Sequence, residues 1–175
     1  MYYYNLLGDK KKSLSTLLIS LLLFSKCVLG ETSLGHVTFE VNTIATCNLL
    51  INGKSSYDYD LGVLFLGQHK RHKPFDVQIK CDSPGLSTAL RASITQGELK
   101  NDGVEFSSGD KPAGLLKLLI DGDNVVPLDK TPFCTGIPVT DGYERICRLT
   151  PLTNIYQEAK GGSFDVGINI DVIIN

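Results

Sequence analysis

The last fourteen residues alternate between apolar and polar side chains without a break from Gly162 to the C-terminus. The apolar positions are Phe164, Val166, Ile168, Ile170, Val172 and Ile174, and Ile173 is the only apolar residue on the other side. This period of two predicts a long β-strand with one buried face and one wet face. Most strands have five or six residues, and a long strand with unpaired edges invites association with other chains. We therefore predict a protein that pairs this strand with a partner.

Residues 1–30 have the features of a secretory signal peptide. Three lysines (10–12) precede an apolar run over 14–24, and the small residue Gly30 suits the cleavage position. The run is much shorter than the roughly 20 residues that span a bilayer. We predict cleavage after Gly30 and an exported domain over 31–175. A lipoprotein modified at Cys27 is the alternative, and the charged residue directly before that cysteine disfavours it.

Cysteine usage agrees with export. The leader carries one of the five cysteines, and the exported part keeps Cys47, Cys81, Cys134 and Cys147. An even number in an exported chain indicates two disulfides. Three connectivities are open, of which we favour the sequential one, Cys47–Cys81 with Cys134–Cys147. The spacing does not fit zinc, because no two cysteines lie within two to four residues and no histidine pairs with them.

The charge of the exported part excludes one class of partner. The leader holds four of the seventeen Lys and Arg residues and one of the nineteen Asp and Glu residues. The exported part therefore keeps 13 basic and 18 acidic residues, a net charge of −5. Such a surface favours solubility and disfavours nucleic-acid binding.

The rest of the chain shows short alternating segments separated by turn residues, for example Leu61, Val63 and Phe65. Asn52-Gly53 and Asp121-Gly122-Asp123 are typical of tight turns and hairpins. The segments lie at 37–41, 47–51, 61–65, 75–81, 90–94, 116–120 and 125–128. Seven or so strands without a sustained helical period predict an all-β sandwich, in which two sheets bury one face each.

Candidate chemistry is sparse. A basic run at 68–73 contains two of the three histidines and could face an acidic glycan or phospholipid, but we favour a solvated loop between two strands. Asp58 and Asp60 could hold a cation or act as acid and base, but a wet strand face accounts for them. Asp121 to Asn124 lacks the further ligands of a calcium loop. Nucleophile-elbow and phosphate-binding glycine motifs are absent. We predict no enzyme, no metal and no cofactor.

At this point the residues resemble a known family, the pilin-type subunits of bacterial chaperone–usher fimbriae. The motifs that carry the resemblance appear in the family's order: Gly35 to Phe39 with Ala45 to Leu49, Asp60 to Val63, Pro74 to Cys81, Ala113 to Leu115 with Ile120 to Gly122, and Gly162 to Ile174. The resemblance covers essentially all of residues 31–175. It identifies Cys81 as the partner of Cys47.

The resemblance implies an incomplete immunoglobulin-like β-sandwich of six strands, which a donated strand completes. A periplasmic chaperone supplies that strand first, an outer-membrane usher assembles the subunit, and a neighbouring pilin subunit then replaces the chaperone strand. The implied groove for the chaperone or donor strand is lined by Gly162, Phe164, Val166, Ile168, Ile170, Val172 and Ile174. The implied location is the fimbrium at the bacterial cell surface, reached through the periplasm.

Two departures from the family refine the prediction. Ile174 stands at the penultimate position, where the family usually has an aromatic residue. Only four residues, 31–34, separate the predicted cleavage site from the first-strand motif, and at about 3.3 Å per residue they are too short for a donor strand. Cleavage after Ser25 would leave only nine. A subunit that accepts a strand without donating one belongs at the fimbrial tip, with a role in adhesion to host cells through a receptor or glycan.

The same residues fit other roles. The chain could be an internal minor or adaptor subunit, or a free-standing secreted β-sandwich that pairs its terminal strand internally. The loop closed by Cys134 and Cys147 could present Tyr143 and Arg145 to a receptor, or it could only stiffen a long connection.

Overall fold

The fold consists of strands throughout the described part of the chain. The computed structural model describes residues 32–42, 44, 47–137 and 144–174. Its strands are β1 (Thr32–Asn42), β2 (Cys47–Ile51), β3 (Ser56–Phe65), β4 (His69–Arg71), β5 (Phe75–Cys81), β6 (Thr88–Gln96), β7 (Glu98–Lys100), β8 (Gly103–Ser108), β9 (Lys111–Ile120), β10 (Asn124–Val125), β11 (Phe133–Gly136), β12 (Glu144–Ile155) and β13 (Gly162–Ile174). The prediction of an all-β fold is confirmed.

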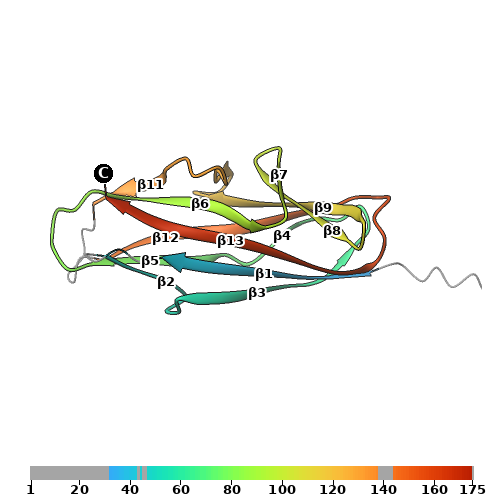
Figure 1. The fold of residues 1–175 in the computed structure, drawn as a ribbon, viewed down its shortest axis with the longest axis horizontal. Helices are drawn as coiled ribbons and strands as arrows, with labels where there is room; N and C mark the ends of the chain where they lie inside the picture. The colour runs from blue at the N-terminus through green and yellow to red at the C-terminus, as the bar shows by residue number, and fades with distance from the viewer. Residues whose placement is uncertain (1–31, 43, 45–46, 138–143, 175) are drawn as a thin grey trace, which may run out of the picture. The chain divides into compact units, whose positions relative to one another are not determined.

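The strands form two sheets. One sheet has the order β11-β6-β13-β1-β3, and the other has the order β2-β5-β12-β9-β8-β7, with β10 beside β9 and β4 beside β12. In Figure 1, β13 runs between β6 and β1 along the length of its sheet. Fully buried side chains from both sheets, such as Phe39, Ile168, Ile79 and Leu116, belong to one apolar core. Strand alternation therefore buries one face of each sheet, as expected for a sandwich.

Two of the sequence-predicted turns are present. Asn52 and Gly53 have positive φ angles of 47° and 80°, and Ile51 and Lys54 exchange backbone hydrogen bonds across them. Asp121 and Gly122, with φ of 51° and 93°, connect β9 to β10. Glycine tolerates this backbone region without a steric penalty, and Asn and Asp are the other residues that adopt it most readily.

One predicted strand face is wrong. Simple alternation would bury Leu61, Val63 and Phe65 together, but Val63 and Phe65 are 47% and 53% exposed, and Leu64 is fully buried instead. The cause is a β-bulge: the register between β1 and β3 shifts at Gly35/His36, and Gly62 has a φ of 68°. A bulge places one extra residue in a strand and thereby reverses which side chains face the core.

Both expected disulfides are present in the structure. Cys47 and Cys81 are directly opposite each other in the β2–β5 pair, so this disulfide lies within one sheet. Cys134 on β11 pairs with Cys147 on β12, and this disulfide therefore links the two sheets.

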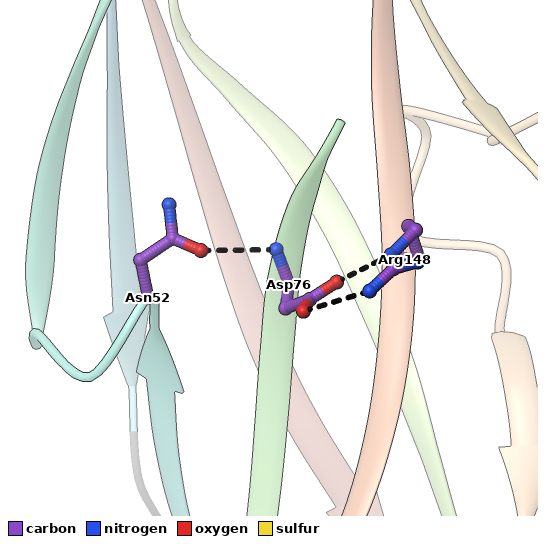
Figure 2. A network of polar contacts seen from close by, with 3 residues as sticks. All are labelled: Asn52, Asp76 and Arg148. Carbon is purple, nitrogen blue, oxygen red and sulfur yellow. Dashed lines mark hydrogen bonds and ion pairs between the residues drawn. The ribbon is translucent and has the colours of Figure 1, made fainter. Parts of the chain in front are cut away.

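A polar network fastens three neighbouring parts of the eight-stranded sheet (Figure 2). Asn52 Oδ1 accepts a hydrogen bond from the backbone N–H of Asp76 at 3.2 Å, and Arg148 Nε and Nη2 donate to the two carboxylate oxygens of Asp76 at 2.8 and 3.1 Å. These hydrogen bonds from Arg148 lower the pKa of Asp76. The network links the turn after β2 to β5 and β12, and as an exposed ion pair it adds little to stability.

Some predictions lie outside the described residues. They include the leader, the cleavage site, Cys27 and Tyr143. Within the residues that the structure does describe, no helix has the length and apolar character needed to cross a membrane.

Candidate functional site: the C-terminal strand and its seam with β1

The predicted groove residues from Phe164 to Val172 share the inner face of β13, whereas Gly162 at the start of the strand is exposed. Phe164, Val166, Ile168, Ile170 and Val172 are all at most 3% exposed. Ile174 differs, because 46% of its surface is exposed at the end of the strand. The sequence alternation thus predicts five of the six buried apolar positions correctly.

One edge of β13 is occupied by the chain's own first strand. β1 and β13 run parallel, with registered pairs from Ser33 with Gly162 to Asn42 with Asp171. Every other strand pair among the described residues is antiparallel. We call this parallel β1–β13 contact the seam. An open groove is absent along these ten pairs, and the placement of a partner's strand there stays a prediction.

Gly35 allows β1 to approach the core side of β13. A Cβ atom at Gly35 would lie 2.2 Å from Phe164 Cζ, well inside the van der Waals distance. Phe164 is itself stacked on Phe106 of the opposite sheet, with ring centroids 3.8 Å apart and an interplanar angle of 10°. Because the ring is packed on both sides, glycine is the residue that fits this position of the seam.

The two ends of the seam are held differently. At the first end the inward residues of β1 are Ser33 and Gly35, and the buried Ser33 Oγ has no hydrogen-bond partner. Further along, Val37 and Phe39 are fully buried, and Phe39 packs on Phe75 of the other sheet with ring centroids 4.6 Å apart. The seam therefore has little apolar side-chain contact from β1 near Gly162 and much more near Ile168.

Polar side chains join β1 to β13 at the far end of the seam. Asn42 Nδ2 donates to Asp171 Oδ1 at 2.8 Å and to Asn169 Oδ1 at 3.3 Å. Asn169 Nδ2 also donates to Asp171 Oδ1 at 2.9 Å. These exposed contacts connect the wet faces of the two strands and fix their register at this end.

The other edge of β13 is only partly paired. β6 pairs with β13 from Gly167 to Ile174 and does not reach the residues before Gly167. Beside this start of β13 lies a hollow of about 660 Å³, lined by Gln96, Gly97, Glu98, Glu105, Phe106, Ser107, Asp110, Pro112, Ser163, Phe164 and Asp165. Glu105 in its wall is paired with Lys100 Nζ and accepts a hydrogen bond from Tyr156 at 2.8 Å, and both contacts lower its pKa.

Asp58 and Asp60, the candidate cation ligands or acid–base pair, each accept a hydrogen bond from within the fold. Asp58 accepts a hydrogen bond from Thr38 Oγ1 at 3.0 Å, and Asp60 Oδ1 accepts one at 2.7 Å from the backbone N–H of Gly62 in the bulge. In the described part of the chain, no three His, Cys, Asp or Glu side chains are grouped as a metal site would require.

The basic run at 68–73 makes two side-chain contacts with other parts of the fold. His69–Arg71 forms the short strand β4, and Arg71 pairs with Asp123. His72 is half-buried against Thr153, with Nε2 and Oγ1 2.9 Å apart, and desolvation together with nearby Lys70 lowers its pKa to about 4. Part of this run is thus a structural connection between strands rather than a uniformly solvated loop.

Arg145 does not extend into solvent as the receptor hypothesis requires. Its guanidinium is half-buried, and it donates to the carbonyl oxygen of Cys134 and, at 2.8 and 3.1 Å, to the hydroxyl and carbonyl oxygens of Thr88. Burial lowers its pKa. Arg145 therefore connects β11, β6 and the second disulfide, and the prediction that it is an exposed side chain is wrong.

Two residues of the site carry no functional signal in the local sequence. Gly35 begins a motif, but nothing in its neighbours reveals that Phe164, more than 120 residues away, fills its Cβ position. The sequence places Ser33 ahead of the first-strand motif, whereas in the structure it lies within β1.

The sequence matches no known protein-family profile and no curated protein. Among solved structures, the fold is similar to one described as the crystal structure of the P pilus rod subunit PapA. The TM-score is 0.44 and the sequence identity is 13%, over 61% of this chain and 82% of that chain.

Proposed function

We propose that this chain is a minor subunit of a chaperone–usher fimbria, located at the tip and contributing to adhesion to host cells. Its partners are a periplasmic chaperone, the outer-membrane usher, one neighbouring subunit that donates a strand, and a host-cell receptor or glycan. Its site is the edge of β13 that β1 covers in the structure, and the role is binding rather than catalysis.

The observation that carries this proposal is the position of β13. The last strand of the chain is thirteen residues long, and its inner face supplies much of the core. One of its edges is held by a parallel strand, a pairing slightly less stable per residue than an antiparallel one. A strand donated by a partner would gain main-chain hydrogen bonds along this edge and would cover apolar residues at alternate positions.

The N-terminal side supports the tip position. β1 begins at Thr32 and is already paired with β3 and β13 near its start. If the leader is removed after Gly30, only Glu31 precedes β1, and a donor strand of ten or more residues has no source there. N-terminal sequencing of the exported chain checks the cleavage site directly.

Co-expression with the chaperone from the same fimbrial gene cluster tests the proposal. We expect a one-to-one complex in the periplasm, an N-terminus at Glu31 and two disulfides by mass spectrometry. Failure of the chain to form a complex with that chaperone would contradict the proposed function. A start well before Ser25 would retain the fimbrial role but would contradict the tip position.

A second candidate is favoured by the seam itself. Because β1 covers β13 over ten pairs, the described fold lacks an open edge there, as a free-standing secreted β-sandwich would. Such a domain would be recovered as a soluble monomer that ignores the chaperone. The same co-expression experiment therefore separates the two functions.

A further inference from the structure

We propose that the disulfide between Cys134 and Cys147 is a thiol-exchange site. A dithiol opens it by attack on Cys134 Sγ, and Arg145 stabilises the thiolate that Cys147 then becomes. This inference goes beyond the proposed function and holds whether or not the chain is a fimbrial subunit.

The two disulfides of the chain differ in exposure and in their support from neighbouring strands. Cys47, Cys81 and Cys147 are at most 3% exposed, whereas Cys134 is only partly buried. Cys47 and Cys81 join β2 to β5, which share five registered pairs. Cys134 lies on β11, the outermost strand of its sheet, which has two registered pairs with β6. A thiolate from solvent should therefore reach Cys134 Sγ more readily than the other three sulfur atoms.

A half-buried cation faces both sulfur atoms of this disulfide. Arg145 Nη1 lies 3.1 Å from Cys134 Sγ and 3.5 Å from Cys147 Sγ. The other hydrogen-bond partners of its guanidinium are oxygens of Cys134 and Thr88, and all of them are neutral. Arg145 Nε is buried without a hydrogen-bond partner. In the described part of the chain, no carboxylate forms an ion pair with this guanidinium.

A thiolate would supply the negative charge that this site lacks. Removing a charge from water is costly, and an oppositely charged neighbour recovers part of that cost. Neither sulfur is charged while the disulfide is closed, so Arg145 makes only weak hydrogen bonds to them. A nearby cation lowers the pKa of a thiol, and a thiol of lower pKa is a better leaving group. Arg145 should therefore favour the reduced state and speed its formation.

The exchange takes two steps with an external dithiol as reductant. One thiolate of the dithiol attacks Cys134 Sγ, the bond between the two cysteines breaks, and its electron pair stays on Cys147 Sγ. The second thiolate of the dithiol then attacks the dithiol sulfur of the mixed disulfide and releases Cys134. The dithiol leaves as a disulfide, and the chain has gained two electrons. Of the two protons that the dithiol loses, one goes to Cys134 and the other to solvent.

Opening this disulfide changes how the two sheets are joined. It links β11 of one sheet to β12 of the other. Cys134 also has a φ of 47°, a backbone region that residues other than glycine, asparagine and aspartate rarely adopt, and cleavage lets it leave that region. Reduction should therefore loosen β11 while the disulfide between β2 and β5 stays closed.

Selective reduction tests the site in the unmodified chain. The oxidised chain, as purified from the periplasm, is incubated with graded dithiothreitol, and free thiols are blocked with N-ethylmaleimide. Peptide mass spectrometry then identifies the labelled cysteines. We expect label on Cys134 and Cys147 at a dithiothreitol concentration about tenfold lower than Cys47 and Cys81 require. Joint reduction of the two disulfides, or earlier reduction of Cys47–Cys81, would overturn the proposal.

Reduced glutathione identifies the sulfur that is attacked. A monothiol forms the mixed disulfide but carries no second thiol to resolve it, so a short reaction stopped with acid traps this intermediate. We expect glutathione on Cys134. Glutathione on Cys147 would overturn the direction of attack and, with it, the role assigned to Arg145.

Arg145→Met tests the charge. It should slow reduction by dithiothreitol by about tenfold, because the leaving thiolate loses its cation, whereas Arg145→Lys should keep most of the rate. Thr88→Val is the matched control, since it removes a neutral contact of Arg145 and leaves the charge beside the sulfur atoms. This control should not slow reduction. Faster reduction in both Arg145→Met and Thr88→Val would show that Arg145 only holds β11 in place, and it would overturn the stabilisation of the thiolate.

Discussion

Replacement of one isoleucine on β13 should cost far more stability than replacement of another on the same face. Ile168 is fully buried and in register with Phe39 on one side and Ile94 on the other, whereas Ile174 is 46% exposed. Because Ile168 has a paired strand on each side, the surrounding backbone cannot close on the cavity that truncation to alanine would leave. We expect Ile168→Ala to lower the free energy of unfolding by about 4 kcal/mol, within the roughly 2–5 kcal/mol known for such truncations.

Ile174→Ala is the matched control. About half of its surface stays in water in the folded state, so its burial contributes about 1 kcal/mol. Guanidinium unfolding of the exported chain, with both disulfides intact, measures the two losses of unfolding free energy. The comparison holds if the two variants have the same dependence of that free energy on denaturant concentration. Losses within about 0.5 kcal/mol of each other would refute the assignment of Ile168 to the core and of Ile174 to the strand end.

Three further predictions concern other parts of the fold. Replacing both Cys47 and Cys81 with alanine should cost about 3–4 kcal/mol on the chain-entropy estimate for a loop of this length, measured by the same unfolding assay. His72 has a lowered pKa of about 4, so its contribution to stability is complete above about pH 6.5, where the unfolded histidine is also neutral, and is lost as the pH falls towards 4. Because His72 is half-exposed, we expect the free energy of unfolding to fall by about 1–2 kcal/mol, less than the full pKa shift implies. Between pH 7 and 4.5, His72→Gln should lose less stability than the unmodified chain. Gly62→Ala should cost about 1 kcal/mol by thermal unfolding because φ is 68° there, although no neighbouring atom would be contacted; an unchanged melting temperature would contradict the bulge.

Local patterns in the sequence predicted those features that depend on neighbouring residues. The alternation from Gly162 to Ile174 predicts both the extent of β13 and its buried face, because a strand places every second side chain on one side. Asn52-Gly53 predicts a turn because both residues tolerate positive φ. The same logic failed at Val63 and Phe65, where a bulge reverses the faces. The Gly62 that accompanies this bulge is in the sequence, but a lone glycine in an alternating run does not say on which side the register shifts.

The partner of each strand was harder to predict than the strand itself. Nothing in residues 32–42 shows that they lie parallel to a strand more than 120 residues later, since pairing depends on the packing of the whole sheet. Arg145 illustrates the same limit: a charged residue in a loop rich in turn formers predicts exposure, yet the fold places acceptors from Cys134 and Thr88 around its guanidinium.

The seam changes what the terminal strand implies. An alternating strand at the end of a chain indicates a need for a partner, and the structure meets that need with a strand from the same chain. A parallel pairing that leaves Ser33 Oγ buried without a hydrogen-bond partner satisfies the edge of β13 at some cost. If a partner strand covered this edge, as we propose, the free energy available to it would be the difference between two ways of covering β13, rather than the full gain from covering a bare edge.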